Sequence, residues 1–470
     1  MTDAERALAV ADLRRRLDRL GGRARAASAA PPPRPGAVAA ASMREGGPPG
    51  SLPPDAEGAV RRLGFRPEPQ PQGAAWVRRV AVDLGPFLQR AGAPHPVTGG
   101  QLLGLSHGPS TEREPAGYDA SACAVLDIET LGLRGSGVVA FLVGLGTPRG
   151  DVLEIDQLLL ADIGAEPALL GALLGRLAAL RLLVTYNGRT FDLPVLRARC
   201  VLTRLGGEQL ETMPHCDLLS PVRQLFRDRL GVCTLRQTEL SLLGFERDGD
   251  APGSEAPERY RAWLQRGDEA RLAGVVRHNQ LDLCATMVLA ARLAAHVEGR
   301  LVQPVHPADR YRLAVHLERH GEAELRDEVD THYRAALAQR RAPWDRHAGH
   351  RLARRLARGG AGDRNEAAAL LRALWGADPG DLRAARALCI LEERRQHLVE
   401  ALAVADAALA TCHRLGAFRL ALMRAAPPGG WAADWERRRA RLTIRVARRG
   451  RSDRPRPEMG LLPGLACATG

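Results

Sequence analysis

The sequence predicts an α/β domain with a mixed sheet, followed by an all-helical region. Short apolar runs of strand length begin at Ala122 and are separated by glycine-bearing turns. Helical patterns then alternate with further short apolar runs as far as about residue 298. Beyond Pro307 only helical patterns remain. Strands first, then alternating strands and helices, are typical of an α/β domain with helices packed on its sheet.

Length and composition narrow the class of protein. The 470 residues, of which 45% are hydrophobic, are enough to bury two cores and still leave extensions. The net charge is +13 and all 67 cationic side chains are arginine. A genome rich in G and C explains most of this arginine, but so basic a chain still favours polyanions such as nucleic acid, DNA or RNA. The eight cysteines form no CxxC pair, and neither an export signal nor an apolar run of membrane-spanning length is apparent, so we expect a cytoplasmic protein without disulfides.

The first 74 residues are predicted to be an N-terminal helix and a disordered linker. Residues 3–20 place leucines near one helical face, so this helix could dock on the body or on a partner. From Gly21 to about Gln72 the chain is dominated by Ala, Pro, Gly and Arg without a sustained period. Residues 75–119 hold short apolar runs broken by Gly, Pro and His, and are interpreted as strands and loops that lead into the next domain.

Residues 120–298 contain the predicted sheet. Four strands are expected in the runs ACAVLDIE, GVVAFLVGLG, DVLEIDQLLL and RLLVTY, and a fifth near residues 213–216. Helices are expected in PALLGALLGRLAAL and FDLPVLRARCVL, around 220–228 and 235–243, and from about 268 to 297.

Residues 300–425 are predicted to form helical repeats. Glu366 and Glu400 open similar helices 34 residues apart, and small apolar residues recur between them. This spacing resembles tetratricopeptide repeats, pairs of helices that stack on one another and can recruit a protein partner. Residues 426–470 form an arginine-rich tail, for which a solvated end and a phosphate contact are both open interpretations.

Four carboxylates carry the functional prediction. Asp127 and Glu129 are two apart on a strand, so they share a face and emerge at its carboxyl end. Asp192 lies in the first turn of a helix, and Asp282 lies within the long helix. Taken alone, Asp127 and Glu129 could be a solvated strand end, and Asp192 could be a helix cap. Gathered at one point, four acids repel unless cations separate them, so together they indicate a two-cation phosphodiesterase site.

Other polar positions admit two interpretations each. His278 lies one helical turn before Asp282 and could be a general base or a surface histidine. Asn187 fits a left-handed turn or a substrate contact, and Phe191 a packing wedge or a substrate contact. Asp217, which ends the fifth predicted strand, could cap the next helix or support the site from behind.

These strings together resemble the DEDD exonucleases of the ribonuclease H-like superfamily. Within it, residues 120–298 are most similar to the bacterial YprB-type ribonuclease H-like domain, whose members often carry tetratricopeptide repeats afterwards. The DxE motif, the NxxxFD motif and the closing His–Asp motif match Asp127, Glu129, Asn187, Phe191, Asp192, His278 and Asp282. Three residues separate His278 from Asp282, whereas the better-known branches have Tyr with three or His with four, so the base role departs from the pattern.

The resemblance implies a five-stranded sheet ordered 3-2-1-4-5 and hydrolysis of nucleic acid from a 3′ end. It implies two Mg²⁺ or Mn²⁺ ions, one activating water and the other stabilising the leaving oxygen, with Asp127 as the ligand that bridges them. Hard divalent ions prefer oxygen ligands, so carboxylates without cysteine fit Mg²⁺ or Mn²⁺ rather than zinc. It also places Arg236, Arg247, Arg259 and Tyr260 on a loop facing substrate, although each could equally be a surface residue. The alternative to a nuclease is a scaffold that binds nucleic acid without cleaving it.

Overall fold

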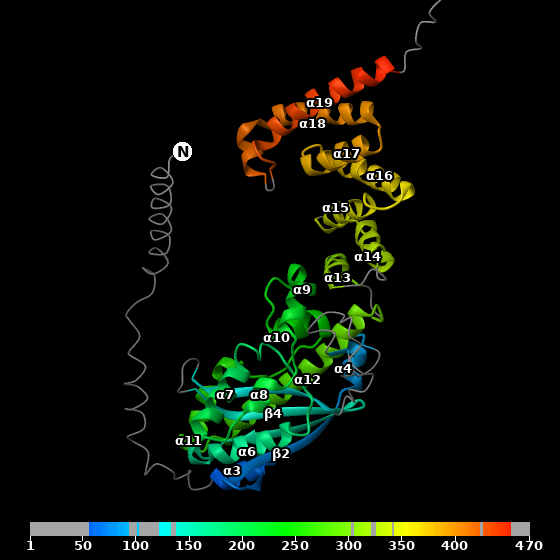
Figure 1. Ribbon diagram of the computed structural model, residues 1–470. Coiled ribbons are helices and arrows are strands. Elements are labelled where there is room, and N and C mark those ends of the chain that lie inside the picture. Colours follow the sequence, from blue (N-terminus) through cyan, green and yellow to red (C-terminus); the bar gives the residue numbers. More distant parts are fainter. Residues whose placement is uncertain are drawn as a thin grey trace, which may run out of the picture.

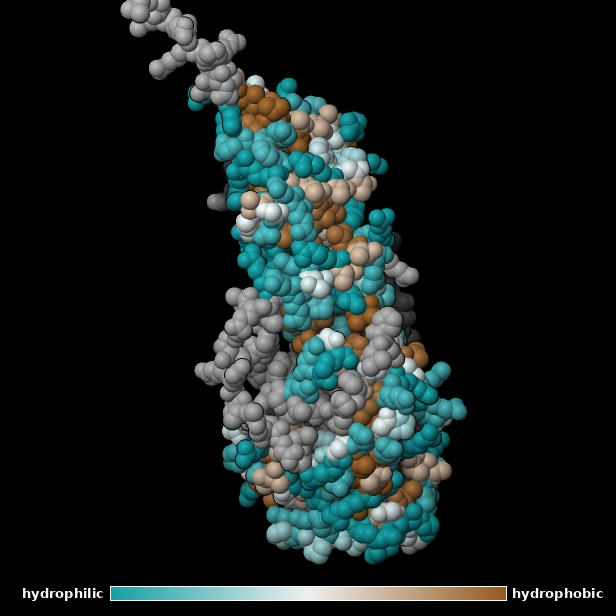
Figure 2. Space-filling model, turned by 90° about the vertical axis from the view of Figure 1, so that its right-hand side faces the viewer, coloured by the Kyte–Doolittle hydropathy of each residue, from teal (hydrophilic) through white to brown (hydrophobic). Residues whose placement is uncertain are grey.

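The computed structural model describes residues 56–93, 101–102, 122–132, 138–301, 305–320, 326–340, 343–423 and 426–452. The predicted helix at residues 3–20 therefore lies outside the described residues. The molecule is elongated, with a body of sheet and helices at one end and a column of helices leading away from it (Figure 1). The same outline, seen from the side, carries apolar residues among the hydrophilic ones along the column (Figure 2).

A mixed seven-stranded sheet forms the centre of the body. The strands lie in the order β1-β2-β5-β4-β3-β6-β7, with β3 parallel to β6, β6 parallel to β7, and the other neighbours antiparallel. Because β3, β6 and β7 run the same way, their carboxyl ends meet at one edge of the sheet. In chain order the strands are Arg66–Gln70, Gly73–Asp83, Cys123–Leu131, Val139–Arg149, Val152–Leu159, Leu182–Thr185 and His215–Asp217.

The sheet has two strands more than predicted, and the predicted linker ends too late. Residues assigned to the linker form α3 (Ala56–Arg62) and β1, and β2 begins at Gly73, inside the same segment. β2 pairs with β5 along eight residues, from Trp76 opposite Leu159 to Asp83 opposite Val152. The partner of β2 is remote in sequence, so the apolar runs after residue 74 could suggest a strand but not its place in this sheet.

Helices cover both faces of the sheet. The longest is α12 (Glu269–Val297). Asp268 caps its N-terminus, because its side chain accepts a hydrogen bond from the backbone N–H of Arg271. By length and composition α12 could cross a membrane, but 78% of its most apolar stretch is buried, as in the core helix of a folded domain. The remaining helices and helical turns of the body are α4 (Gly85–Arg90), η2 (Ile163–Ala165), α6 (Glu166–Leu177), α7 (Asp192–Thr203), α8 (Glu208–Thr212), α9 (Leu219–Leu230), α10 (Leu235–Thr238), η3 (Glu239–Leu243), η4 (Gly253–Glu255) and α11 (Ala256–Arg266).

The column consists of helices that each pack on the next. α13 packs on α9 of the body, where Arg312 forms an ion pair with Asp228 and His316 hydrogen-bonds Gln224. One cluster of buried apolar side chains extends from the body into the column, so the two parts share a hydrophobic core. Its helices are α13 (Pro307–His320), α14 (Arg326–Ala338), α15 (Trp344–Leu356), α16 (Ala361–Ala377), α17 (Leu382–Arg394), α18 (Leu398–Leu422, interrupted at Gly416) and α19 (Gly430–Ser452).

Residues 430–452 were predicted to belong to an arginine-rich tail, and this prediction is wrong. They form α19, which packs on α18. Trp431, Trp435 and Leu442 of α19 are buried. Several of its arginines pair with acids of the preceding helices, as Arg441 does with Glu393 at 2.6 Å. The high arginine content of the segment obscured the helical spacing of Trp431, Trp435 and Leu442. Packing on α18 stabilises the helix.

Candidate active site

Strand β3 carries the first two acids to the edge of the sheet where β6 ends. Val125 of β3 lies opposite Val184 of β6, so Asp127 and Glu129 extend beyond the paired residues, next to the turn that follows β6. Glu129 is buried and Asp127 is half-buried. The register with β4 shifts between Glu129 and Thr130, so the strand is irregular where its acids emerge.

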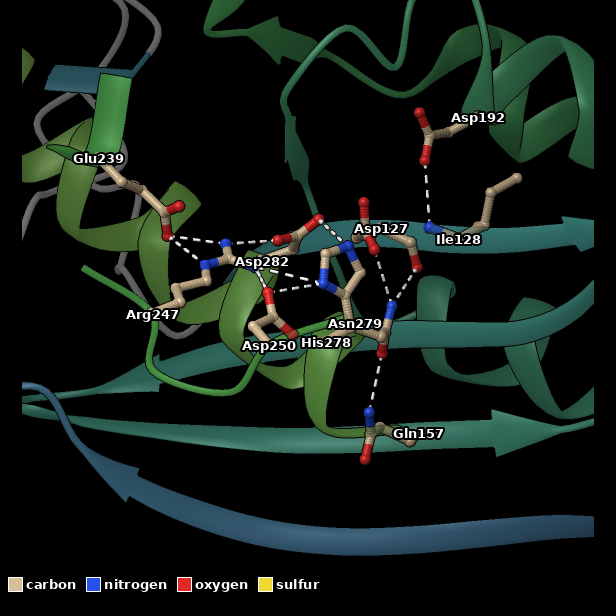
Figure 3. A network of polar contacts seen from close by, with 10 residues as sticks. All are labelled: Asp127, Ile128, Gln157, Asp192, Glu239, Arg247, Asp250, His278, Asn279 and Asp282. Carbon is tan, nitrogen blue, oxygen red and sulfur yellow. Dashed lines mark hydrogen bonds and ion pairs between the residues drawn. The ribbon is translucent and has the colours of Figure 1, made fainter. Parts of the chain in front are cut away.

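Asp192 is joined to the same strand by a hydrogen bond. It is the first residue of α7, it is buried, and its carboxylate accepts a hydrogen bond from the backbone N–H of Ile128 at 3.1 Å (Figure 3). Ile128 lies between Asp127 and Glu129, so the acid of the second motif is held against the acids of the first.

Asp217 shapes the turn between β6 and α7. Its carboxylate accepts hydrogen bonds from the backbone N–H groups of Asn187 (2.8 Å), Arg189 (3.1 Å) and Leu219 (3.0 Å). The third contact lies at the start of α9 and the first two lie in the NxxxFD turn. Both interpretations of Asp217, helix cap and support for the site, are therefore consistent with its contacts.

The two predicted substrate contacts of this turn have structural partners. Asn187 has a φ of 72°, the left-handed conformation that asparagine tolerates, and its side-chain oxygen accepts a hydrogen bond from the Thr190 hydroxyl at 2.7 Å. Phe191 is half-buried and packs against the core on the α7 side of the sheet. Their contacts favour roles in holding the turn, and substrate contact by either stays a prediction.

Asn279, which the sequence analysis missed, ties α12 to β3. It is fully buried, and its side-chain amide donates hydrogen bonds to the Asp127 carboxylate (2.8 Å) and to the Asp127 backbone carbonyl (3.2 Å). Its oxygen accepts a hydrogen bond from Gln157 of β5 at 2.9 Å (Figure 3). Its place in the string HNQLD, between His278 and Asp282, was the only signal that could have pointed to it.

Gly144 of β4 makes this approach of α12 possible. A Cβ atom there would lie 2.3 Å from the Asn279 side-chain oxygen and 2.7 Å from a methyl carbon of Leu283, closer than such atoms can come. We expect Gly144→Ala to lower the free energy of unfolding by about 1–3 kcal/mol, since α12 must move off the strand, and to reduce metal-dependent hydrolysis. Thermal melts and nuclease assays measure both effects.

Gly175→Ala is the matched control for that substitution. No atom lies within 4 Å of a Cβ at Gly175, which lies in α6. Alanine in a helix is favoured over glycine, so this variant should be as stable as the parent or slightly more stable. Equal behaviour of the two alanine variants would contradict the packing role of Gly144.

Arg247 lies at the centre of a network of buried acids. Its side chain is only 6% exposed and forms ion pairs with Glu239 at 2.7 Å, Asp250 at 3.0 Å and Asp282 at 2.5 Å (Figure 3). Burial opposes its charge, but the three acids raise the pKa of Arg247 above its ordinary value. The family resemblance predicted that Arg247 lies on a loop facing substrate, with a surface position as the alternative. Instead, Arg247 is buried beside the site and pairs with Asp282, one of the four predicted metal ligands.

His278 lies between this network and Asp282. Its Nδ1 is 2.9 Å from the Asp250 carboxylate and its Nε2 is 3.7 Å from the Asp282 carboxylate. Burial acts to raise the pKa of Asp250, but hydrogen bonds with Arg247 and His278 outweigh it, so this pKa is lowered and the group is ionised. An ionised Asp250 accepts a hydrogen bond from the Nδ1–H group of His278, and Nε2 is then the basic nitrogen, on the side of Asp282.

The predicted acids repel one another strongly. Burial, and then the charges of Asp282, Asp192 and Glu129, raise the pKa of Asp127 well above its usual range. Burial and the charges of the neighbouring acids raise the pKa of Glu129 in the same way. Burial raises the pKa of Asp192 to about 7, despite its hydrogen bonds with backbone N–H groups. Acids from β3, α7 and α12 therefore share one electrostatic environment, which a cation would relieve.

Stability should depend on pH through these acids. A carboxyl whose pKa is raised in the folded state binds protons more tightly when folded, so its contribution is full below the unfolded pKa near 4 and is lost as pH rises through about 7 for Asp192. In EDTA, the melting temperature of Asp192→Asn should therefore rise relative to that of the parent as the pH increases from about 4 to about 7. If the difference in melting temperature between the two proteins did not change with pH, the raised pKa of Asp192 would be contradicted. Added Mn²⁺ should remove the decline of the parent's melting temperature with rising pH.

The oxygen donors of these four acids fit Mg²⁺ or Mn²⁺ in kind. Within the described residues, however, no three His, Cys, Asp or Glu side chains already lie close enough together to hold a metal ion. One carboxylate oxygen of Asp282 pairs with Arg247, and the other lies 3.7 Å from Nε2 of His278. A cation shared with the other acids would therefore compete with these two partners for Asp282.

Comparisons with known proteins agree with this architecture. Residues 124–294 match a family model described as the RNase_H superfamily, a range that holds all four acids, Asn279 and Arg247. This part of the chain is therefore similar to that superfamily. A Bacillus subtilis protein named as the uncharacterized protein YprB is 31% identical over 222 residues, which are 47% of this chain and 52% of that protein. The chain thus spans about half the length of that relative.

A solved structure is also similar, at a lower level. It is the family B DNA polymerase from the hyperthermophilic archaeon Pyrobaculum calidifontis, with a TM-score of 0.31 and 16% identity, covering 44% of this chain and 30% of that one.

Proposed function

We propose that this protein is a metal-dependent nuclease that hydrolyses phosphodiester bonds of nucleic acid, as a 3′–5′ exonuclease on single-stranded or frayed ends. The observation that carries the proposal is that a hydrogen bond joins Asp192 to Ile128, between Asp127 and Glu129, in a ribonuclease H-like domain, with Asp282 near enough for its charge to raise the pKa of Asp127 and Glu129. Buried acids that raise one another's pKa gain from cations, and phosphate brings further negative charge that cations must offset. The 3′–5′ direction rests on the motifs Asp127–Glu129, Asn187–Asp192 and His278–Asp282, and a cytoplasmic location is part of the proposal.

The four acids would hold two Mg²⁺ or Mn²⁺ ions in this proposal. When bound, such ions supply positive charge at the attacking and leaving oxygens of phosphodiester hydrolysis. Asn279 holds the Asp127 carboxylate in place through the hydrogen bond at 2.8 Å. Asp192 is fixed in the same way by the backbone of Ile128.

His278 is suited to move a proton in this site. Asp250 accepts the hydrogen bond from Nδ1, so Nε2 is the atom that takes a proton from an attacking water molecule. The imidazolium that forms lies between the carboxylates of Asp250 and Asp282, which stabilise its charge. Its side chain is 13% exposed, and Gly253 of η4 lies next to its Nε2 atom.

Product analysis tests the proposal. DNA and RNA oligonucleotides labelled at the 3′ or the 5′ end are incubated with the protein and Mn²⁺, with Asp127→Asn as the blank. An exonuclease acting from the 3′ end releases a labelled mononucleotide at once from 3′-labelled strands and a ladder from 5′-labelled ones. A strand cut first at internal positions contradicts the exonuclease mode, and no Mn²⁺-dependent cleavage of any strand contradicts the nuclease.

A non-catalytic scaffold is the second candidate, and one observation favours it. Arg247 already neutralises Asp282, so the described site is stable without a cation at that position. In this alternative the ribonuclease H-like domain binds nucleic acid and the helical column, with its tetratricopeptide-like spacing, recruits a protein partner. Calorimetry that detects Mn²⁺ binding, combined with no cleavage of DNA or RNA, would favour the scaffold.

A further inference from the structure

A cavity of about 590 Å³ lies between the body and the first helix of the column. Its walls come from the turn after β6, from α9 and from α13. Helices α9 and α13 lie side by side above the sheet (Figure 1). Five arginines line it against only two aspartates: Arg189, Arg223, Arg227, Arg312 and Arg319 against Asp217 and Asp228.

The two aspartates offset only part of this positive charge. Asp217 accepts three backbone hydrogen bonds, and Asp228 forms its ion pair with Arg312. In the part of the chain that the structure describes, the guanidinium groups of the other four arginines form no ion pair, and their residues are exposed. Four unpaired cations facing one cavity from three elements repel one another and favour an anionic ligand.

The cavity borders the acidic site. Asn187 and Asp217 line it, and the same turn leads within five residues to Asp192. Along the sheet edge the order is therefore β3 with Asp127, the turn after β6, β7 with Asp217, and then the arginines of α9. A strand whose end lies at the four acids would continue over the NxxxFD turn into the cavity.

We propose that this cavity binds the phosphodiester backbone of a single nucleic-acid strand a few nucleotides away from the scissile bond. The inference rests on the proposed function for the position of the strand's end. Arg223 and Arg227 lie one helical turn apart on α9, and Arg319 faces them from α13, so the cations form two walls along the strand's path. No Phe, Tyr or Trp is among the described residues that line the cavity, so the site would contact phosphates rather than stack on bases, without sequence preference.

Strand binding without metal tests this site. Fluorescence anisotropy follows a labelled DNA or RNA strand of about 12 nucleotides in EDTA, at salt concentrations from about 50 to 200 mM. Arg223→Gln/Arg227→Gln should weaken binding about tenfold and reduce the slope of log affinity against log salt by about 1.4, since each single-strand phosphate contact contributes about 0.7. Arg319→Gln should reduce the slope by about half as much, from the opposite wall.

The matched control is Arg354→Gln/Arg358→Gln. These two arginines are also exposed, four residues apart and away from the cavity, so the change of charge is the same. Unchanged affinity and slope in this control, with both reduced in the cavity variants, support the site. Equal effects of the two double variants overturn it, and so does tighter binding of a phosphopeptide of equal charge, which would indicate a protein partner.

Failure of this inference is distinguishable from failure of the proposed function. Binding is measured without divalent cations, so it does not depend on hydrolysis. If the parent cleaves nucleic acid and the cavity variants bind as tightly as the parent, the proposed strand-binding site is contradicted and the proposed nuclease function is not. The absence of cleavage with reduced binding by the variants would keep the site and favour the scaffold. Comparison of the DNA and RNA strands shows which backbone the cavity prefers.

Discussion

Asp127→Asn is expected to lower Mn²⁺-dependent hydrolysis of an oligonucleotide by about 10³-fold or more. The substitution keeps the shape of the side chain and an oxygen that can accept the hydrogen bond from Asn279, but it removes the charge that a cation needs. Without metal the variant should melt no lower than the parent, because one of several mutually repelling acids is neutralised. Initial rates of product release and thermal melts in EDTA measure the two effects.

Glu154→Gln provides the matched control for the charge change. Glu154 lies on β5, is exposed, and pairs only with Arg149 at 3.4 Å among the described residues. Its hydrolysis rate should equal that of the parent. If Asp127→Asn retained the parent's rate, neither the two-cation site nor the nuclease would stand.

Arg247→Ala is expected to give the largest loss of stability, about 3–5 kcal/mol in the free energy of unfolding. The substitution leaves Glu239, Asp250 and Asp282 without their shared cation in a buried environment. Burial already raises the pKa of Glu239 to about 7 even with the arginine present. Losing the arginine should therefore force protons onto these acids and loosen the loop that carries Asp250. Denaturant unfolding at neutral pH measures the loss.

Arg271→Ala is the control for a lost arginine. Arg271 lies on α12, is 44% exposed, and pairs with Glu258 and Asp268 at 3.6 and 3.3 Å. Exposed pairs contribute about 0–1 kcal/mol, so its loss should be small. Added Mn²⁺ should restore more stability to Arg247→Ala than to the parent, because Asp282 is then free to bind it. Equal stability of the two alanine variants would contradict the central place of Arg247.

The sequence by itself determined the elements whose cause is local. Alternating and continuous apolar runs predicted β3 to β6, and the 3.6-residue period predicted α7, α9 and α12 close to their observed bounds. The motifs predicted that Asp127, Glu129, Asp192 and Asp282 meet. The charges of Asp282 and Asp192 raise the pKa of Asp127 and Glu129, which is consistent with this prediction. Short-range spacing and strand direction are enough for such inferences, because both act within a few residues of each acid.

Only the tertiary structure decided what depends on distant partners. β2 is a strand because β5 offers it an edge, and α19 is folded because α18 covers its tryptophans. Asn279 and Arg247 became part of the site through contacts with Asp127 and Asp282, and the arginines of the basic cavity meet only because α13 packs on α9. Hydrogen bonds and ion pairs between remote segments leave no periodic trace in a single sequence, so their partners emerge when the chain is folded.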